Sequence, residues 1–241
     1  MTVLWWLLAC QRAPDTLTVA AASSLTDAFG DLAARFEDEH PGVQVDVTFA
    51  GSQTLATQLR HGLPADVFAS ADPAHVDALR AEGLVADAAP FARNQLVLAV
   101  AADAPPVDLA HLPDVARLVV GDDEVPVGRY TATLLDRAAA RYGAAWREAV
   151  EARVRSREPN VRLVLAKLAL GEADAAIVYA TDAAGVAGIR AVALPADLAP
   201  EATYVQARVL AGPQPALAAD WLALVAGPGR ELLTARGFAA P

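Results

Sequence analysis

The sequence of 241 residues is poor in the features that mark several classes of protein. Its single cysteine, Cys10, excludes a disulfide within the chain. Aromatic residues make up only 6% of the chain, its lysines and arginines form no cluster, and the formal net charge is −10. Nucleic acids and anionic membranes are bound through basic patches, so we expect neither as a partner.

The residues needed for catalysis are also scarce. There are four histidines, and no pair of them has the spacing of metal ligands. A serine hydrolase using Ser24 or Ser52 is the enzymatic alternative, but the sequence has no Gly-x-Ser-x-Gly elbow. We also expect the histidines to lie at helix ends, in loops or on exposed helices, away from the five stretches described below, two of which contain these serines. That leaves the serines without a base. We therefore predict that the chain is not an enzyme. The histidines are His40, His61, His75 and His111.

What the sequence does contain is an apolar fraction of 55%, enough for the core of one large domain or two small ones. Short β-rich runs alternate with helical ones, which predicts an α/β fold with helices covering a parallel sheet. A loop at 86–94 and a proline-rich stretch at 104–106 favour two doubly wound lobes. The expected strands are 17–21, 43–49, 66–70, 95–101, 117–121, 174–179 and 204–210. Apolar residues recur at helical spacing at Leu25, Phe29, Leu32 and Phe36, and at Val161, Leu165 and Leu168.

Five short stretches place small or hydroxyl-bearing residues where a strand is expected to end or a helix to begin. Backbone N–H groups at helix starts, together with hydroxyls, hold an oxyanion without any basic side chain. The first two stretches follow neighbouring strands, so both are expected at the carboxyl edge of the sheet, where ligands bind in such folds. The stretches are 21–26, 49–55, 125–130, 159–162 and 177–179.

Each stretch also has an ordinary structural interpretation. Ser24 and Ser52 are of the type that commonly caps helices without any ligand. Tyr179 is either a hydroxyl donor to a ligand or a core tyrosine whose hydroxyl is bonded within the protein. Arg129 and Arg162 lie beside two of the expected helix starts, and we expect them to be solvated surface groups rather than ligand contacts.

In their order and spacing, these motifs are similar to those of the periplasmic molybdate-binding proteins of bacterial molybdate ABC transporters. The likeness runs from about residue 17 to 238 and includes a C-terminal pair of helices. The motifs are A-A-S-S-L-T, F-A-G-S-Q-T-L, P-A-D-V-F-A-S-A-D, V-P-V-G-R-Y, N-V-R and A-D-A-A-I-V-Y-A-T-D-A.

The resemblance implies a fold like that of the class II periplasmic binding proteins. In that fold, hinge strands join two doubly wound α/β lobes, and the ligand lies in the cleft between them. Residues 15–94 plus 205–241 would form lobe 1, and residues 95–204 would form lobe 2. The chain would be a monomer outside the cytoplasm that delivers its ligand to the membrane permease of an ABC transporter.

The resemblance further implies that the ligand is tetrahedral molybdate or tungstate, held by neutral donors. There would be no cofactor, and molybdenum would be bound only as the oxyanion, not by side chains. The family's ligand groups fall on Ser24, Ser52, the amides of Val127 and Val161, and the Tyr179 hydroxyl. The sequence departs from the family at Val127, where alanine is common, and at position 51, where a glycine replaces a common serine. The glycine leaves one hydroxyl fewer, which bears on affinity.

Residues 1–10 form an apolar run that resembles a bacterial lipoprotein signal, in which the final cysteine is acylated. The resemblance implies that residues 1–14 are a signal and tether, with lipid anchoring through Cys10. The run is shorter than the ~20 residues of a spanning helix. It has no Lys or Arg ahead of it, and a start further upstream or a buried cysteine on an apolar strand are the alternatives.

A pocket lined only by donors would discriminate between oxyanions. Hydrogen phosphate carries a proton that needs an acceptor, and leaving it unpaired costs roughly 1–3 kcal/mol. Sulfate has no such proton, so its rejection would depend on its smaller size. A binding protein of the same fold for sulfate or phosphate is the main alternative, because the fold alone does not define the ligand.

Overall fold

The computed structural model describes residues 15–241, so the predicted signal and Cys10 lie outside the described residues. In this part of the chain, nine strands form a mixed sheet. Eight of them follow the order β2-β1-β3-β9-β4-β7-β5-β6, and β8 pairs separately with β4. The strands are β1 Asp15–Ala22, β2 Val43–Ala50, β3 Val67–Ser70, β4 Val85–Ala101, β5 Leu118–Gly121, β6 Val154–Glu158, β7 Ala175–Tyr179, β8 Ile189–Ala193 and β9 Glu201–Val209.

Helices cover this sheet. The α-helices are α1 Thr26–Glu39, α2 Ser52–Arg60, α3 Pro73–Ala81, α4 Pro126–Tyr142, α5 Ala144–Glu151, α6 Val161–Ala169, α7 Ala180–Ala183, α8 Pro215–Ala226 and α9 Arg230–Ala235. Two short 3-10 helices, η1 Ser23–Leu25 and η2 Leu112–Asp114, lie between them.

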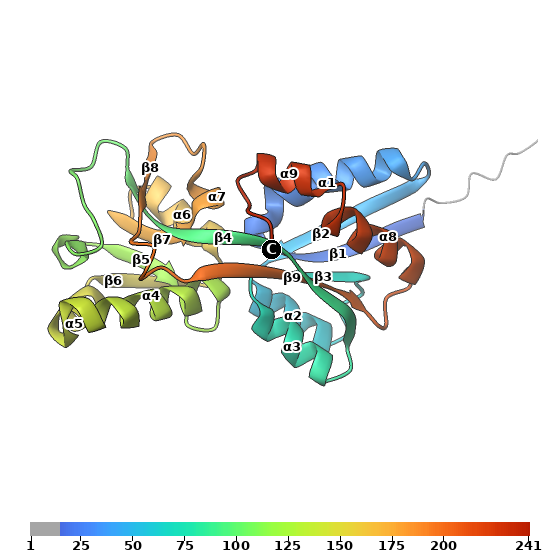
Figure 1. Cartoon of the computed structure of the whole chain (residues 1–241), viewed down its shortest axis with the longest axis horizontal. Helices are drawn as coiled ribbons and strands as arrows, with labels where there is room; N and C mark the ends of the chain where they lie inside the picture. Colours follow the sequence, from blue (N-terminus) through green and yellow to red (C-terminus); the bar gives the residue numbers. More distant parts are fainter. Residues whose placement is uncertain (1–14) are drawn as a thin grey trace, which may run out of the picture.

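Two groups of parallel strands lie toward opposite ends of the molecule (Figure 1). β1 pairs with β2 and β3 in one group, and β5 pairs with β6 and β7 in the other. The long strands β4 and β9 run antiparallel to each other between the groups, where β9 pairs with β3 and β4 with β7. The observed fold is thus α/β, as predicted, with a mixed rather than wholly parallel sheet.

The helical spacing predicted from the sequence is confirmed in α1. Phe29, Leu32 and Phe36 are all fully buried. Both phenylalanine rings pack edge-on against Trp221 of α8, with centroids 5.5 and 5.6 Å apart. The predicted pair of C-terminal helices therefore exists, as α8 and α9, and it returns the end of the chain to α1. Arg236 after α9 pairs with Asp31 of α1 at 2.7 Å.

The predicted loop at 86–94 is wrong, because these residues form the first half of β4 and pair with β9. The register shifts between Ala86 and Ala89 and again between Pro90 and Ala92. Asp87 also has a φ of 55°. These bulges break the period of two that a strand shows in sequence, so the segment resembles a loop although its backbone is paired.

Two further strands were not predicted. β6 has the sequence VRSRE and β8 the sequence IRAVA, and each holds charged or small residues where buried strands hold large apolar ones. Both pair with a single neighbour, β6 with β5 and β8 with β4. Strands at such positions are only partly buried, and their sequences therefore carry a weak signal.

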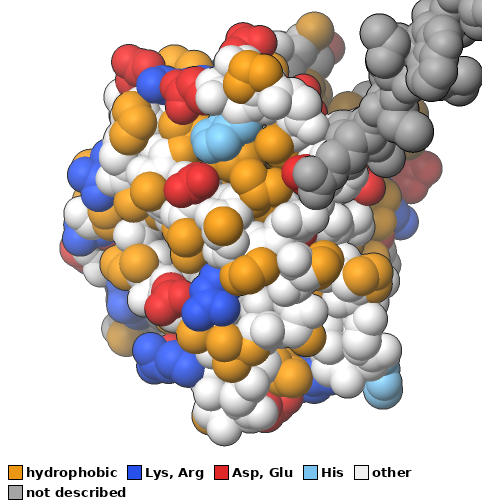
Figure 2. All heavy atoms as spheres, turned by 90° about the vertical axis from the view of Figure 1, so that its right-hand side faces the viewer, with side chains coloured by type: hydrophobic (Ala, Val, Ile, Leu, Met, Phe, Trp, Pro, Cys, Tyr) orange, Lys and Arg blue, Asp and Glu red, His pale blue; other side chains and the backbone are white. Residues whose placement is uncertain are grey.

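The surface carries no continuous basic field on the face shown in Figure 2, where acidic and basic side chains are interspersed. Among residues 15–241, none of the helices has the length and apolar character needed to cross a membrane.

Candidate functional site

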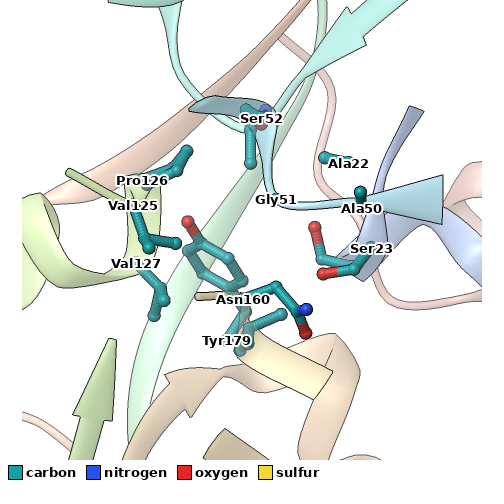
Figure 3. Close-up of a pocket in the computed structure, with 13 residues that line it drawn as sticks. Ala22, Ser23, Ala50, Gly51, Ser52, Val125, Pro126, Val127, Asn160 and Tyr179 are labelled. Atoms are coloured by element: carbon teal, nitrogen blue, oxygen red, sulfur yellow. Dashed lines mark hydrogen bonds between the residues drawn. The ribbon is translucent and has the colours of Figure 1, made fainter. Parts of the chain in front are cut away.

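A small pocket lies where the ends of β1, β2 and β7 meet the first turns of α4 and α6 (Figure 3). All five predicted site residues line it: Ser24 and Ser52 from one group of elements, and Val127, Val161 and Tyr179 from the other. Its cavity volume of about 10 Å³ is far smaller than that of the pockets that hold organic ligands. The other lining residues, all uncharged, are Ala22, Ser23, Ala50, Gly51, Ala71, Val125, Pro126 and Asn160.

The Ser24 hydroxyl is oriented by a buried chain of hydrogen bonds. Tyr204 Oη donates to Ser24 Oγ at 2.9 Å. Asn94 Nδ2 in turn lies 3.4 Å from Tyr204 Oη and donates to Thr181 Oγ1 at 2.8 Å. Because Ser24 Oγ already accepts a hydrogen bond from Tyr204, its own hydrogen remains available to a ligand in the pocket.

The Ser52 hydroxyl also accepts a hydrogen bond from the protein, but from a backbone amide. Ser52 is the first residue of α2, and its Oγ accepts a hydrogen bond from the Ala71 amide at 3.1 Å. The residue in the capping position is Gly51, which has no side chain to offer. Ser52 is therefore not a helix cap, and neither is Ser24, which lies inside η1. Both hydroxyls act as acceptors toward the protein and remain donors toward the pocket.

Backbone amides complete the set of donors. Val127 and Val161 lie in the first turns of α4 and α6, where an amide has no carbonyl partner within the helix. Asn160 caps α6, since its Oδ1 accepts a hydrogen bond from the Leu163 amide at 3.0 Å. The positive ends of these helix dipoles point toward the pocket, which favours an anion there.

Tyr179 contributes a buried hydroxyl from the end of β7. The residue is 1% exposed, and its Oη has no hydrogen-bond partner among the described residues. Burial raises the pKa of Tyr179 well above its ordinary value, so the phenol keeps its proton at neutral pH and is a donor. Figure 3 shows this hydroxyl inside the ring of lining residues. A buried donor without a partner is costly, which indicates that an acceptor belongs in the pocket.

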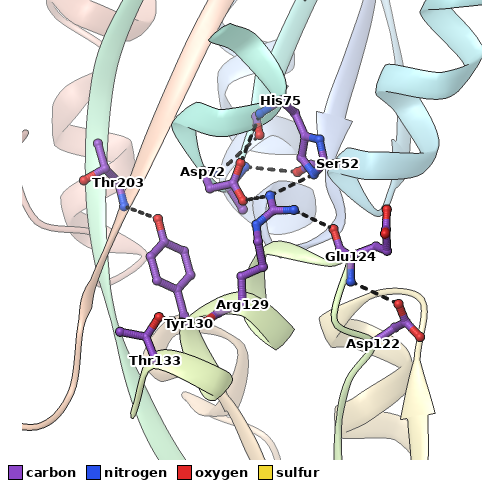
Figure 4. Close-up of polar contacts among 11 residues, drawn as sticks. Ser52, Asp72, His75, Asp122, Glu124, Arg129, Tyr130, Thr133 and Thr203 are labelled. Atoms are coloured by element: carbon purple, nitrogen blue, oxygen red, sulfur yellow. Dashed lines mark hydrogen bonds and ion pairs between the residues drawn. The ribbon is translucent and has the colours of Figure 1, made fainter. Parts of the chain in front are cut away.

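The prediction that Arg129 and Arg162 are not ligand contacts agrees with the structure, because neither lines the pocket. Both guanidinium groups are nevertheless held in ion pairs and are not simply solvated. Arg129 pairs with the buried Asp72 and also donates to the Glu124 carbonyl at 2.9 Å (Figure 4). Arg162 lies 2.5 Å from Asp27 and 3.0 Å from Asp182. Both side chains are about one third exposed and link elements of the two strand groups.

The expectation that the histidines lie away from the five stretches is wrong for His75. Its Nε2 lies 2.9 Å from Arg129 Nη2, in the third stretch. Burial lowers the pKa of His75, and the charge of Arg129 adds to this effect, whereas Asp72 opposes it. The neutral ring accepts from the guanidinium. Nothing in the sequence indicated this contact, because α3 and α4 meet only in the folded chain.

Asp182 is a fully buried carboxyl three residues after Tyr179. Burial raises its pKa to about 7, an effect that the positive charge of Arg162 opposes and the negative charge of Asp27 reinforces. In the unfolded chain, the same group is ionised above about pH 4. Protonation of Asp182 is therefore linked to folding between these two pH values.

We expect Asp182→Asn to remove part of the pH dependence of stability. The folded chain keeps a proton that the unfolded chain loses between about pH 4 and 7, so stability falls as the pH rises through this range. As the pH rises from 5 to 8, the free energy of unfolding of the variant should increase by on the order of 2 kcal/mol relative to that of wild type. Thermal unfolding of the ligand-free chain at both pH values measures the gain, with the exposed Asp103→Asn as control. An equal change at both pH values would contradict the expectation.

The sequence analysis missed the residues that orient Ser24. Tyr204, Asn94 and Thr181 lie on β9, β4 and α7, far from Ser24 in sequence. Tyr204 falls within a predicted strand, and nothing in the sequence marks its hydroxyl as a donor to residue 24. Only the pairing of β9 beside β3 brings it there.

Comparison with known proteins assigns the chain to a family. The family model described as bacterial extracellular solute-binding protein matches residues 17–239. The molybdate-binding protein ModA of Mycobacterium tuberculosis is 37% identical over 94% of this chain and 85% of its own length. ModA of Escherichia coli is 35% identical over 73% of this chain and 70% of its own length.

Solved structures share the fold at lower identity. A periplasmic molybdate-binding protein from Azotobacter vinelandii superimposes with a TM-score of 0.81 at 18% identity, covering 93% of this chain and 99% of its own. The sulfate-binding protein SubI of M. tuberculosis has the same TM-score and identity, and the match covers 94% of this chain and 87% of SubI. At this level of identity the likeness shows the fold, and the same fold holds proteins named for different oxyanions.

Proposed function

The chain belongs to the family of bacterial extracellular solute-binding proteins, and from this membership we propose that it captures molybdate in the pocket lined by Ser24, Ser52 and Tyr179. Its relatives at 37% and 35% identity are named as molybdate-binding proteins, which supports this ligand. Members of the family carry solutes and are not enzymes, so the hydrolase alternative is set aside.

The observation on which the proposal depends is the donor character of the pocket. The Tyr179 hydroxyl is buried without a partner among the described residues, and the Ser24 and Ser52 hydroxyls each accept a hydrogen bond from the protein and keep their own hydrogen to donate. With the first-turn amides of Val127 and Val161, five donors face a small space lined by uncharged residues. A fully ionised tetrahedral dianion offers only acceptors and satisfies all of them.

The same donor set accounts for selectivity against phosphate. Hydrogen phosphate would place its proton beside a donor, at a cost of roughly 1–3 kcal/mol. Asp182, the nearest buried carboxyl in sequence to Tyr179, is not among the lining residues and so supplies no acceptor to the pocket. Tungstate has the same charge and shape as molybdate, so we expect both to bind.

The remaining parts of the proposal concern delivery. The chain would present its ligand to an ABC transporter permease from outside the cytoplasm, as a monomer anchored through a lipid on Cys10. Mass measurement of the protein isolated from cells tests the lipid. The B. subtilis relative at 30% identity, described as a putative substrate-binding lipoprotein, is consistent with such an anchor.

Isothermal titration with molybdate, tungstate, sulfate and phosphate tests the proposed ligand. We expect micromolar or tighter binding of molybdate and tungstate, weak binding of sulfate and none of phosphate. Preference for sulfate or phosphate would overturn the assignment in favour of a receptor of the same fold for another oxyanion.

We also expect the molecule to become more compact on binding. Lobe 1, proposed as residues 15–94 plus 205–241, supplies the serines, and lobe 2, residues 95–204, supplies the other donors. A ligand bonded to both lobes favours their closed arrangement. Small-angle scattering with and without molybdate measures the change, and an unchanged radius of gyration would count against closure.

A further inference from the structure

Gly51, Gln53 and Pro159 make a contact that joins the two sides of the pocket. Gly51 and Gln53 flank Ser52 at the start of α2, and Pro159 comes just before the first turn of α6. Gln53 Nε2 donates to the Pro159 carbonyl at 2.8 Å, across 106 positions of sequence. We propose that these three residues form a clasp that closes the pocket over a bound oxyanion and slows its release. The inference rests on the proposed function of the pocket.

Gly51 supplies the space that the clasp needs. A Cβ atom at this position would lie 2.3 Å from the Pro159 carbonyl oxygen, a backbone atom of the opposite side. It would also lie 2.5 Å from Gln53 Oε1 and 2.6 Å from Gln53 Nε2, so the amide group that bonds to Pro159 would have to move as well. Gly51 has a φ of −61° and a ψ of 140°, which any residue adopts without strain. The close approach of the two segments therefore requires a glycine. An alanine at this position would destabilise the closed arrangement of the pocket more than the open one.

Gln53 holds the segment before α6 in place through its bond to Pro159. Its Oε1 is buried without a partner among the described residues, so the Nε2 bond to Pro159 is the contact that fixes this amide across the pocket. Pro159 is followed directly by Asn160, the cap of α6, and by Val161. Holding the Pro159 carbonyl thus fixes the segment that presents the Val161 amide. Gln53 is a positioning residue in this arrangement and does not line the pocket.

The clasp predicts a specific kinetic effect. The ion enters the open molecule, and the clasp forms afterwards. Removing the clasp should therefore raise the rate of dissociation and leave the rate of association nearly unchanged. We expect Gly51→Ala to release molybdate about 10- to 100-fold faster, the range set by the cost of forcing a methyl group into a packed contact. Gln53→Met keeps the length of the side chain without its donor and should release molybdate about fivefold faster. Association should change by less than about threefold in both variants.

Stopped-flow measurement of molybdate binding and release tests the clasp. The matched control is Gly30→Ala on α1, where a Cβ atom meets nothing within 4 Å. Thermal unfolding of the ligand-free Gly51→Ala and Gln53→Met variants should match wild type, which separates the clasp from a general loss of stability, whereas Gly30→Ala should be slightly more stable because it lies within a helix. Release of molybdate from Gly51→Ala at the wild-type rate would refute the clasp and leave the proposed ligand untouched.

The two proposals fail in different ways. If titration shows that the wild-type chain prefers sulfate, the ligand assignment is wrong, and the same comparison of variants is made with sulfate as the probe. Faster release of sulfate from Gly51→Ala would then support the clasp, whereas an unchanged rate would refute it.

Discussion

Replacing both Ser24 and Ser52 with alanine is expected to weaken molybdate binding by about 10²- to 10⁴-fold. Each hydroxyl contributes a hydrogen bond to a charged group, worth about 1.5–3 kcal/mol, and the two serines lie on separate elements. Their partners, Tyr204 and Ala71, would remain as buried donors aimed at the missing oxygens, which adds to the loss. Isothermal titration of the two single variants and the double variant measures the effect.

The control for this prediction is Ser156→Ala on β6, a serine that does not line the pocket. It should bind molybdate as the wild type does. If both single variants also titrate like wild type, the serines are structural residues and the donor set proposed for the pocket is wrong. A loss confined to one of them would assign the ligand to that side of the pocket.

Ser52→Asp is expected to abolish binding. A carboxylate about 4 Å from a dianion, at an effective dielectric constant of about 20, opposes binding by about 8 kcal/mol. The fold should tolerate the change, since an acidic residue is favourable in the first turn of a helix and the introduced carboxylate would still accept from the Ala71 amide. No molybdate binding should be detectable by titration, while thermal unfolding stays close to that of wild type.

Ser52→Thr provides the matched comparison, because it keeps the hydroxyl at the same position. It should bind molybdate far more tightly than the aspartate variant. Binding by Ser52→Asp within about tenfold of wild type would show that residue 52 does not face the ligand. Weak binding accompanied by a large drop in melting temperature would instead show that the carboxylate disturbs α2.

Much of the fold was predictable from sequence because its elements have strong periodic patterns. The buried strands β1, β3, β5 and β7 and the apolar faces of α1 and α6 were all expected. The first half of β4 was not, because its bulges interrupt the pattern. β6 and β8 were not, because their five-residue sequences VRSRE and IRAVA hold charged and small residues in place of large apolar ones. The prediction was thus most accurate where burial imposes a regular sequence.

The sequence by itself determined which segments can offer donors to an anion. Small and hydroxyl-bearing residues at the ends of strands and the starts of helices leave amides unpaired, and this property is local. The five stretches were identified in this way, whereas the resemblance to the molybdate-binding family pointed to one residue in each. The structure brings all five of these residues to one pocket.

Only the tertiary structure decided how these donors are oriented and what surrounds them. Tyr204 turns the Ser24 hydroxyl toward the pocket, Arg129 is held by Asp72, and the Pro159 carbonyl lies against Gly51. Each of these contacts joins residues that are more than 50 positions apart. Their geometry depends on how β4 and β9 position the two groups of strands relative to each other. Local sequence patterns do not specify that position, because it is set by contacts between residues distant in sequence.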